Sequence, residues 1–247
     1  MTDTPAENAQ QASFRSDVTV ELVKHSAADS DVLWAARVST AGEQSLDELR
    51  KDPERSKGLI NFLMRDRHGS PFEHNSMTFF ISAPIFVFRE FMRHRVGWSY
   101  NEESGRYREL EPVFYVPGES RKLVQEGRPG KYRFVEGTPE QHELTGRVME
   151  DAYRQAYRAY QEMLAAGVAR EVARAVLPVG LFSSMYATCN ARSLMHFLGL
   201  RTQHEQAKVP SFPQREIEMV GERMEAEWAK LMPLTHAAFN ANGRVAP

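Results

Sequence analysis

Residues 88–110 read FREFMRHRVGWSYNEESGRYREL and carry a dense group of cationic side chains. The arginines in this stretch are Arg89, Arg93, Arg95, Arg106 and Arg108, and Arg67 precedes them. The helical spacing of Ile85, Phe88 and Met92 predicts a helix that begins near Pro84, with one apolar face and one charged face. We expect this helix to end at Gly97, so its charged face leads directly into the polar residues that follow.

The charged face has two explanations. It is either a solvated helix surface, on which Glu90 pairs with Arg93 and His94, or part of a ligand site. The residues after the helix favour the ligand site, because Ser104 and Gly105 offer a hydroxyl and backbone N–H groups immediately before the guanidinium of Arg106. Such donors are the usual means of holding a phosphate. The sequence therefore predicts a phosphorylated ligand.

Composition limits the class of protein. The chain has 247 residues, enough for one large domain or two small ones, and a formal net charge of −2. A nucleic-acid-binding protein usually has a basic excess, so we expect no nucleic-acid partner. Any anion site must be a local concentration of positive charge.

Cysteine usage and hydropathy indicate the compartment. The single cysteine, Cys189, excludes an intramolecular disulfide and a cysteine-rich zinc site, and it fits a reducing environment. No apolar run reaches about 18 residues, so no membrane span is expected. Residues 1–17 are polar and lack the apolar core of a signal peptide, which predicts a disordered tail and a cytoplasmic protein.

Periodicity, caps and breakers predict the order of the elements along the chain. Strands are expected at 18–23, 77–81, 113–116 and 181–188, helices at 26–39, 57–66, 139–166, 168–176 and 191–200, a loop at 117–138, and a final helix at 215–231. Four or five strands without a regular βαβ rhythm indicate an α+β fold, a single domain over 18–240 with a mixed or antiparallel sheet flanked by helices. No Gly-x-Gly-x-x-Gly turn follows a strand, so a dinucleotide would not be held in the Rossmann manner.

Two further arginines have settings that suggest a ligand. Arg192 follows the predicted cap Asn190 and faces the positive end of the helix dipole, which favours a bound anion, and His196 lies one turn further along the same face. The alternative is that Asn190 only caps the helix and Arg192 points to water. Arg174 lies in an apolar segment, where it either extends its charged end to solvent or contacts a ligand.

Metal and nucleophile chemistry find less support. His68, Glu73 and His74 are spaced unlike the known metalloprotease and zinc motifs, so we expect no metal site. Ser104 lacks a Gly-x-Ser-x-Gly elbow, and Cys189 has no neighbour that would lower its pKa. Neither residue is supported as a nucleophile.

Several motifs resemble those of one family. The sequence RHR at 93–95 is followed by SYNEESGRY at 99–107, and AARVS at 35–39, SPFEH at 70–74, APIFV at 83–87, REVARAVLP at 170–178, NARSLM at 190–195 and LR at 200–201 stand in order around it. Together they resemble the flavin-dependent thymidylate synthases over most of residues 18–232.

The resemblance implies a homotetramer with active sites shared between subunits. It implies an enzyme that converts dUMP to dTMP with 5,10-methylenetetrahydrofolate as carbon donor, NADPH as reductant and FAD as cofactor, without an enzymic cysteine nucleophile. The implied cofactor residues are Ser70, Arg93, His94, Arg95, Glu102, Asn190, Ala191, Arg192 and His196, with His68 beside the flavin. The implied substrate residues are Glu90, Phe91, Met92, Arg93, Glu102, Glu103, Ser104, Gly105, Arg106, Arg174 and Arg201. Arg201 is implied as a catalytic cation beside the uracil, and Ser104 and His68 complete the implied catalytic set.

The chain departs from the family pattern in three places. One extra residue lies among Val96, Gly97 and Trp98, Glu90 stands where glutamine is often found, and His196 stands where asparagine can occur. Two segments, 117–138 and 203–213, have no motif to guide them. Two alternatives are a nucleotide-binding protein without turnover and a metal-dependent phosphohydrolase built on His68, Glu73 and His74.

Overall fold

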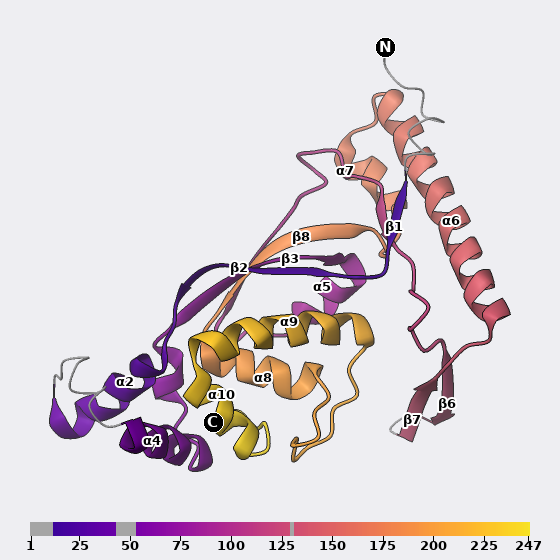
Figure 1. Cartoon of the computed structure of the whole chain (residues 1–247). Helices are drawn as coiled ribbons and strands as arrows, with labels where there is room; N and C mark the ends of the chain where they lie inside the picture. Colours follow the sequence, from indigo (N-terminus) through magenta and orange to yellow (C-terminus); the bar gives the residue numbers. More distant parts are fainter. Residues whose placement is uncertain (1–11, 43–52, 129–130) are drawn as a thin grey trace. The chain divides into compact units, whose positions relative to one another are not determined.

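A computed structural model describes residues 12–42, 53–128 and 131–247 of the chain (Figure 1). The chain folds into two compact units, each made of three stretches. The first unit comprises Met1–Asp17, Ala83–Phe86 and Glu103–Ser183, and the second comprises Val18–Ser82, Val87–Glu102 and Ser184–Pro247.

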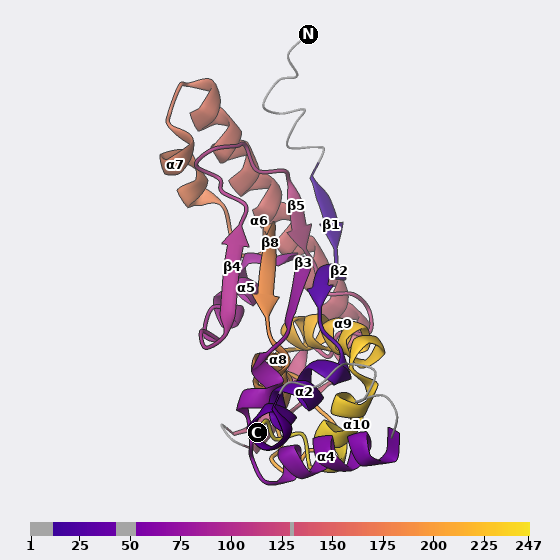
Figure 2. The ribbon, with the colours of Figure 1, turned by 90° about the vertical axis from the view of Figure 1, so that its left-hand side faces the viewer.

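The main sheet has four strands in the order β2-β3-β8-β4, which lie side by side in Figure 2. Their bounds are β2 (Thr19–Ser26), β3 (Ser76–Pro84), β4 (Trp98–Glu102) and β8 (Phe182–Cys189). β2 pairs antiparallel with β3, and β4 pairs antiparallel with β8. Alternate residues of β3, among them Met77, Phe79 and Ile81, are fully buried, as expected for a strand with one face on the core.

Helices of the second unit supply the rest of its core. They are α2 (Asp29–Ala41), α4 (Pro53–Arg65), the short 3-10 helix η1 (Ser70–Glu73), α5 (Ile85–Phe91, of which 87–91 belong to this unit), α8 (Ala191–Arg201), α9 (Arg215–Leu231) and α10 (Pro233–Ala241). α8 and α9 lie side by side, and α9 also contacts β2 and α10 (Figure 1). Val220, Met224 and Trp228 of α9 form a buried stripe at helical spacing.

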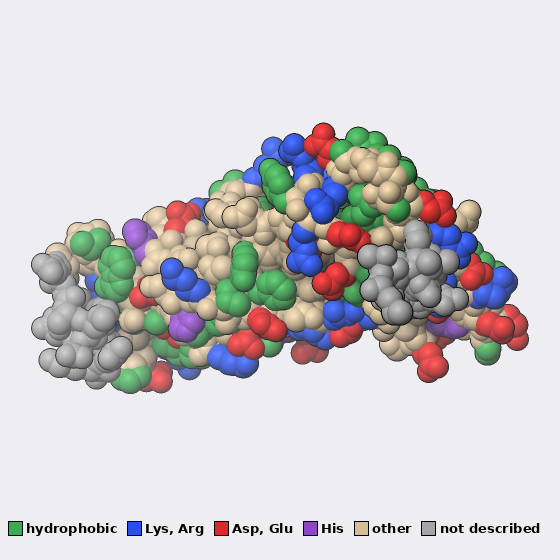
Figure 3. All heavy atoms as spheres, turned by 90° about the horizontal axis from the view of Figure 1, so that it is seen from above, with side chains coloured by type: hydrophobic (Ala, Val, Ile, Leu, Met, Phe, Trp, Pro, Cys, Tyr) green, Lys and Arg blue, Asp and Glu red, His purple; other side chains and the backbone are tan. Residues whose placement is uncertain are grey.

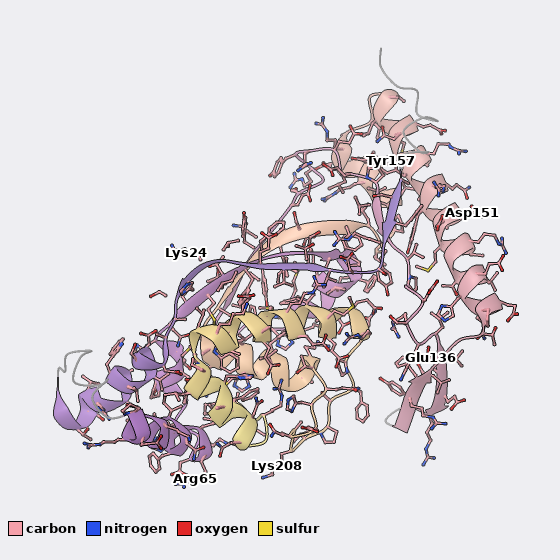
Figure 4. All side chains as sticks on the ribbon, in the orientation of Figure 1. Lys24, Arg65, Glu136, Asp151, Tyr157 and Lys208 are labelled. Carbon is pink, nitrogen blue, oxygen red and sulfur yellow. The ribbon has the colours of Figure 1, made fainter. Side chains whose placement is uncertain are left out.

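The first unit is built around the long helix α6 (Pro139–Ala165). Thr138 caps this helix with a reciprocal capping box, since its hydroxyl accepts the N–H of Gln141 at 3.3 Å and its own N–H donates to the Gln141 side chain at 2.8 Å. Tyr153 and Tyr157, the latter labelled in Figure 4, contact the buried ring of Phe114. The remaining elements of the unit are β1 (Ser13–Arg15), β5 (Val113–Tyr115), β6 (Val124–Arg128), β7 (Lys131–Val135), α7 (Arg170–Ala173) and the 3-10 helix η2 (Arg174–Val176).

The fold class agrees with the prediction, and several elements differ from it. The predicted loop 117–138 contains the antiparallel hairpin β6–β7, and α10 follows the helix that was predicted to be the last. Residues 13–15 of the predicted tail form β1, which pairs parallel with β5, while residues 1–11 lie outside the described residues. The predicted helix 168–176 is divided into α7 and η2. The prediction of four or five strands was also wrong, because eight are present in the described ranges.

The helix after Pro84 is shorter than predicted. α5 ends at Phe91 instead of Gly97, and Met92, which was expected on the apolar face, is 40% exposed. Val87, Phe88 and Phe91 form the buried side. The RHR motif therefore lies in a turn after the helix, where its side chains are free of the helical spacing.

The surface carries both signs of charge. Basic and acidic side chains are interspersed on the face drawn in Figure 3, in keeping with the small net charge of the chain. None of the helices within the described ranges combines the length and apolar character needed to cross a bilayer.

Candidate functional site

The second unit contains a cavity of about 440 Å³, within the usual size range of small-molecule sites. It lies between the turn that follows α5 and the first turn of α8. Its lining residues are Glu73, Arg93, His94, Arg95, Val96, Gly97, Trp98, Asn190, Arg192, Ser193 and His196.

The turn after α5 forms one wall of the cavity. The Arg93 N–H donates to the Glu90 carbonyl at 3.2 Å, and the His94 N–H donates to the Phe91 carbonyl at 2.9 Å. The Tyr100 hydroxyl on β4 donates to the carbonyls of Phe91 and His94 at 3.1 and 2.8 Å. These bonds fix the backbone of the RHR turn, whose three side chains line the cavity.

The segment 96–98, within which the extra residue lies, docks on α8. The Ser193 hydroxyl donates to the Val96 carbonyl at 2.9 Å. Gly97 has φ +69°, and a Cβ there would overlap the Ser193 oxygen, so both the backbone angle and the space require glycine. The departure from the family pattern therefore joins the two walls of the cavity.

The first turn of α8 forms the second wall. Asn190 caps the helix as predicted, since its side-chain oxygen accepts the Ser193 N–H at 2.9 Å. The Ala191 N–H donates to the Asn75 side chain at 2.7 Å. The positive end of the α8 dipole is thus adjacent to the cavity.

Arg192 is held from three sides at the edge of the cavity. Its Nη1 lies 2.5 Å from Glu73 Oε1, and its Nε donates to the main-chain oxygen of Pro247 at 2.6 Å. The guanidinium packs on Gly69, where an added Cβ would lie 2.5 Å from Arg192 Cζ. These contacts exclude the alternative in which Arg192 only points to water.

The cavity has an excess of positive charge. Three guanidinium groups and one carboxylate, that of Glu73, line it. Burial, with Arg201 and His196 nearby, lowers the pKa of His94 to about 4. Burial, with Arg192 and Arg67 nearby, also lowers the pKa of His196. Both imidazoles are therefore mainly neutral at pH 7 and act as hydrogen-bonding groups, while the arginines attract an anion.

Arg201 and Glu90 lie beside this cavity through their contact with His94. Arg201 Nη1 lies 2.5 Å from Glu90 Oε2, and its Nε donates to His94 Nε2 at 3.2 Å. Burial raises the pKa of Glu90, an effect that Arg201 opposes and Glu216 increases. The solvated-surface explanation paired Glu90 with Arg93 and His94, whereas the ion pair of Glu90 in the structure is with Arg201. A cation fixed in this way can stabilise negative charge on a neighbouring ligand.

The predicted phosphate-binding residues lie together in the first unit. The Arg106 N–H donates to the Ser104 hydroxyl at 3.3 Å, which closes a tight turn around the buried Gly105. A Cβ at Gly105 would lie 3.3 Å from Arg174 Cδ, so the turn packs directly on Arg174. Arg106 Nε pairs with Glu171 at 2.9 Å. The turn combines two guanidinium groups with backbone donors, as phosphate binding requires.

The other predicted residues lie away from the cavity lining. His68 is exposed and contacts Phe62 edge-on, with ring centroids 5.7 Å apart. Phe91 stacks on Phe197 in the core, and Glu103 pairs with Arg108 at 3.2 Å. Ser70 opens η1, Met92 is exposed, and Glu102 ends β4.

The candidate metal ligands have other contacts. Glu73 binds Arg192, and His74 packs edge-on against Trp34 with ring centroids 5.5 Å apart. Across residues 12–42, 53–128 and 131–247, no three His, Cys, Asp or Glu side chains are grouped so that they could hold a metal ion. Cys189 is buried in β8, and burial raises the pKa of its thiol, so it is unsuited to act as a nucleophile.

Sequence reasoning gave no ligand role to five residues of the cavity wall. Val96, Gly97 and Trp98 were named as the place of the extra residue, Ser193 received no role, and Glu73 was considered only as a metal ligand. Ser193 stands three residues after the cap Asn190, a spacing that places it in the first helical turn beside any anion. The pairing of Glu73 with Arg192 spans 119 positions of the sequence and has no local signal.

Comparison with known proteins shows the family of the chain. The family described as "Thymidylate synthase complementing protein" matches residues 21–234 of the chain. The flavin-dependent thymidylate synthase of Streptomyces avermitilis is 93% identical over 247 residues, which cover 100% of both chains. The chain belongs to the flavin-dependent thymidylate synthase family. Within this family, the enzyme of Tropheryma whipplei is 60% identical over 235 residues, 95% of this chain and 97% of its own.

Solved structures confirm the α+β fold of this flavin-dependent thymidylate synthase family member. The UMP/dUMP methylase PolB from Streptomyces cacaoi, bound with 5-Br UMP, has a TM-score of 0.88 and 57% identity, covering 96% of this chain and 99% of its own. PolB bound with 5-Br dUMP has a TM-score of 0.89 and 58% identity, with 95% and 100% covered.

Proposed function

We propose that this chain is a thymidylate synthase that methylates dUMP to dTMP. The carbon comes from 5,10-methylenetetrahydrofolate, and NADPH supplies the reducing equivalents through FAD. The observation that carries the proposal is the cavity of the second unit, in which three arginines and the start of α8 face one space in a member of this family.

The cavity suits an anionic dinucleotide. Arg93, Arg95 and Arg192 offer forked donors for the diphosphate of FAD, and Asn190 and Ala191 place the positive end of α8 beside it. Neutral His94 and His196 can hydrogen-bond to uncharged parts of the cofactor, and Trp98 adds an aromatic surface. FAD supplies the hydride chemistry when bound. We assign Ser70, His68 and Glu102 to the periphery of the same site.

The residues proposed for the substrate form two groups, each within one unit. In the second unit, Arg201 is the cation for the uracil ring, where it would stabilise negative charge and make C5 more nucleophilic. Glu90 holds Arg201 at 2.5 Å, and Phe91, Met92 and Arg93 directly follow Glu90 in the sequence. In the first unit, Ser104, Gly105, Arg106 and Arg174 would bind the nucleotide phosphate, with Glu103 beside them.

We also propose that residues 18–240 form one catalytic domain and that the protein is a cytoplasmic homotetramer with active sites shared between subunits. FAD carries a diphosphate and dUMP carries a phosphate, so the two ligands require two separate groups of cationic residues. The arginines of the cavity are proposed for the diphosphate, and the Ser104–Arg106 turn is proposed for the phosphate of dUMP. The molar mass in solution and the copy number of bound dUMP per tetramer test this assembly.

UMP is a second candidate substrate. PolB, at 57% identity over 96% of this chain, is a UMP/dUMP methylase. Parallel assays with dUMP and UMP, scored by chromatography of the methylated nucleotide, determine whether this chain accepts both.

The purified protein provides the test of the function. We expect the absorbance of oxidised flavin, and dTMP formation that requires methylenetetrahydrofolate and NADPH. A nucleotide-binding protein without turnover would bind dUMP and give neither flavin absorbance nor dTMP. A metal-dependent phosphohydrolase would be colourless and would release phosphate until a chelator was added. Either result would contradict the proposal.

A further inference from the structure

A buried arginine near the end of the chain joins three helices of the second unit. Arg244 is 3% exposed, and its guanidinium donates to both carboxylate oxygens of Glu225, at 2.6 and 2.8 Å. It also donates to the Asn240 side chain at 2.7 Å and to the Thr202 hydroxyl at 2.9 Å. Glu225 belongs to α9, Asn240 belongs to α10, and Thr202 caps α8 directly after Arg201. Arg244 therefore fixes the end of the helix that carries the proposed catalytic cation.

The residues next to Arg244 contact Arg192 at the edge of the cavity and Arg67, which lies near the lining residue His196. The Arg67 Nη1 donates to the Ala246 carbonyl at 2.8 Å, and the Arg192 Nε donates to the main-chain oxygen of Pro247 at 2.6 Å. Pro247 is itself buried. On the other side, the backbone N–H of Lys208, a residue labelled in Figure 4, donates to the Gly243 carbonyl at 2.9 Å. We name residues 243–247 the C-terminal brace.

Backbone conformation marks the same contact. Among the described residues, the two non-glycine residues with positive φ are Arg67, at 63°, and Arg244, at 54°. Left-handed backbone is unfavourable for such residues and persists where surrounding contacts hold it. Arg244 belongs to the brace, and Arg67 hydrogen-bonds to the brace residue Ala246. The fold therefore maintains the contact between Arg67 and the brace although both arginines adopt an unfavourable backbone conformation.

The brace leaves defined donors of Arg192 for a ligand. A guanidinium has five N–H donors in a rigid fork. Pro247 takes the Nε–H and Glu73 takes one Nη1–H, so the Nη2 side remains for an anion. Arg67 adds a second positive charge near His196, whose pKa it helps to lower. The orientation of both guanidinium groups is thus set before a ligand binds.

We propose that Arg244 is a positioning residue for the cofactor site: through the C-terminal brace it orients Arg192 at the edge of the cavity and Arg67 near His196. This inference rests on the proposed assignment of the cavity to FAD. An unbraced arginine must lose rotamer freedom when it binds, so removal of the brace should weaken FAD binding about tenfold.

A double-mutant cycle tests the proposal in the full-length apoprotein, with FAD fluorescence quenching as the measure of affinity. The variants are a deletion of Ala246 and Pro247, Arg192→Ala with Arg67→Ala, and their combination. We expect the deletion to weaken FAD binding about tenfold in the wild-type background and to have little further effect when both arginines are already absent. Asn242→Ala is the matched control, because the Asn242 side chain binds Asn61 and the Ala238 carbonyl and not Arg192 or Arg67.

A second variant, Arg244→Lys, tests the proposal if the deletion variant does not fold. Arg244→Lys keeps a positive charge opposite Glu225, but one ammonium group cannot span Glu225, Asn240 and Thr202 together. We expect it to weaken FAD binding in the wild-type background only. Equal weakening in both backgrounds, or none, would overturn the brace while the assignment of the cavity stood. Unchanged FAD affinity in Arg192→Ala with Arg67→Ala would overturn that assignment and the brace together.

Discussion

Arg201 and Glu90 form an ion pair in which Nη1 and Oε2 are 2.5 Å apart, with 16% and 26% of their side chains exposed. Arg201 ends α8 and Glu90 lies on α5, so the pair connects α8 with the helix that leads into the RHR turn of the cavity. Because His94 Nε2 accepts from Arg201 Nε at 3.2 Å, the cation has a fixed direction. A charged group held in this way needs little reorganisation when negative charge develops nearby.

Arg201→Ala should preserve FAD binding and reduce dTMP formation by about 100-fold or more, the usual cost of removing a group that stabilises developing charge. Flavin absorbance and single-turnover dTMP formation are the measurements. Arg65→Ala is the matched control, because Arg65 pairs with Asp66 on the exposed side of α4. Unchanged turnover in Arg201→Ala would remove this residue from the chemistry.

Ser104→Ala should weaken dUMP binding by about three- to tenfold, the value of one hydrogen bond, and slow chemistry less. The hydroxyl accepts the Arg106 N–H at 3.3 Å and so shapes the turn that is proposed to hold the phosphate. Calorimetric dUMP affinity and the single-turnover rate at saturating dUMP separate the two effects. A large loss of rate with unchanged affinity would restore Ser104 as a nucleophile.

Local signals predicted the helices with strong ends. Helix α9 has the predicted bounds, and α8 is one residue longer than predicted, because Asn190 and the apolar spacing lie within the segment itself. The end of α5 was missed, since the turn that replaces it is held by the Tyr100 side chain from the next strand and, at Val96, by Ser193, which is distant in sequence. The β6–β7 hairpin was missed because β6 is largely exposed and polar, so it has no buried alternation to detect.

The candidate site shows the same division. The RHR motif and the residues from Asn190 to His196 could be predicted as one group of ligand-binding side chains, and the structure brings them to one cavity. The contacts that orient them were not predictable, because Glu73 and Pro247 meet Arg192 only in the folded chain. Arg244 had no feature in the sequence to distinguish it from a surface arginine.

Gly69→Ala should leave stability nearly unchanged and weaken FAD binding. The added Cβ would lie 2.5 Å from Cζ and Nε of Arg192, and a flexible side chain can move away at small cost in folding free energy. That movement displaces the guanidinium from the cavity. Gly58→Ala is the control, because its Cβ would meet nothing within 4 Å on α4, where alanine favours the helix by about 0.5–1 kcal/mol. FAD affinity should fall in Gly69→Ala alone, and a loss of thermal stability without a loss of affinity would contradict the packing argument.

Glu225 should make the protein acid-labile. Burial alone would raise the pKa of Glu225, but its hydrogen bonds with Arg244 and His236 lower it to about 2, from an ordinary 4.5. A lowered folded-state pKa stabilises the fold above the unfolded-state value, and this contribution disappears as pH falls from 4.5 toward 2. The contribution is on the order of 2 kcal/mol after allowance for partial solvent screening.

Urea unfolding at pH 6 and at pH 3 tests this contribution. Between these two pH values the wild type should lose about 2 kcal/mol more unfolding free energy than Glu225→Gln, because the glutamine cannot bind the proton. Glu227→Gln is the control, since Glu227 pairs with Lys230 on the same helix near the surface. Parallel pH profiles for the wild type and Glu225→Gln would mean that the Glu225–Arg244 pair does not control the acid stability of the brace.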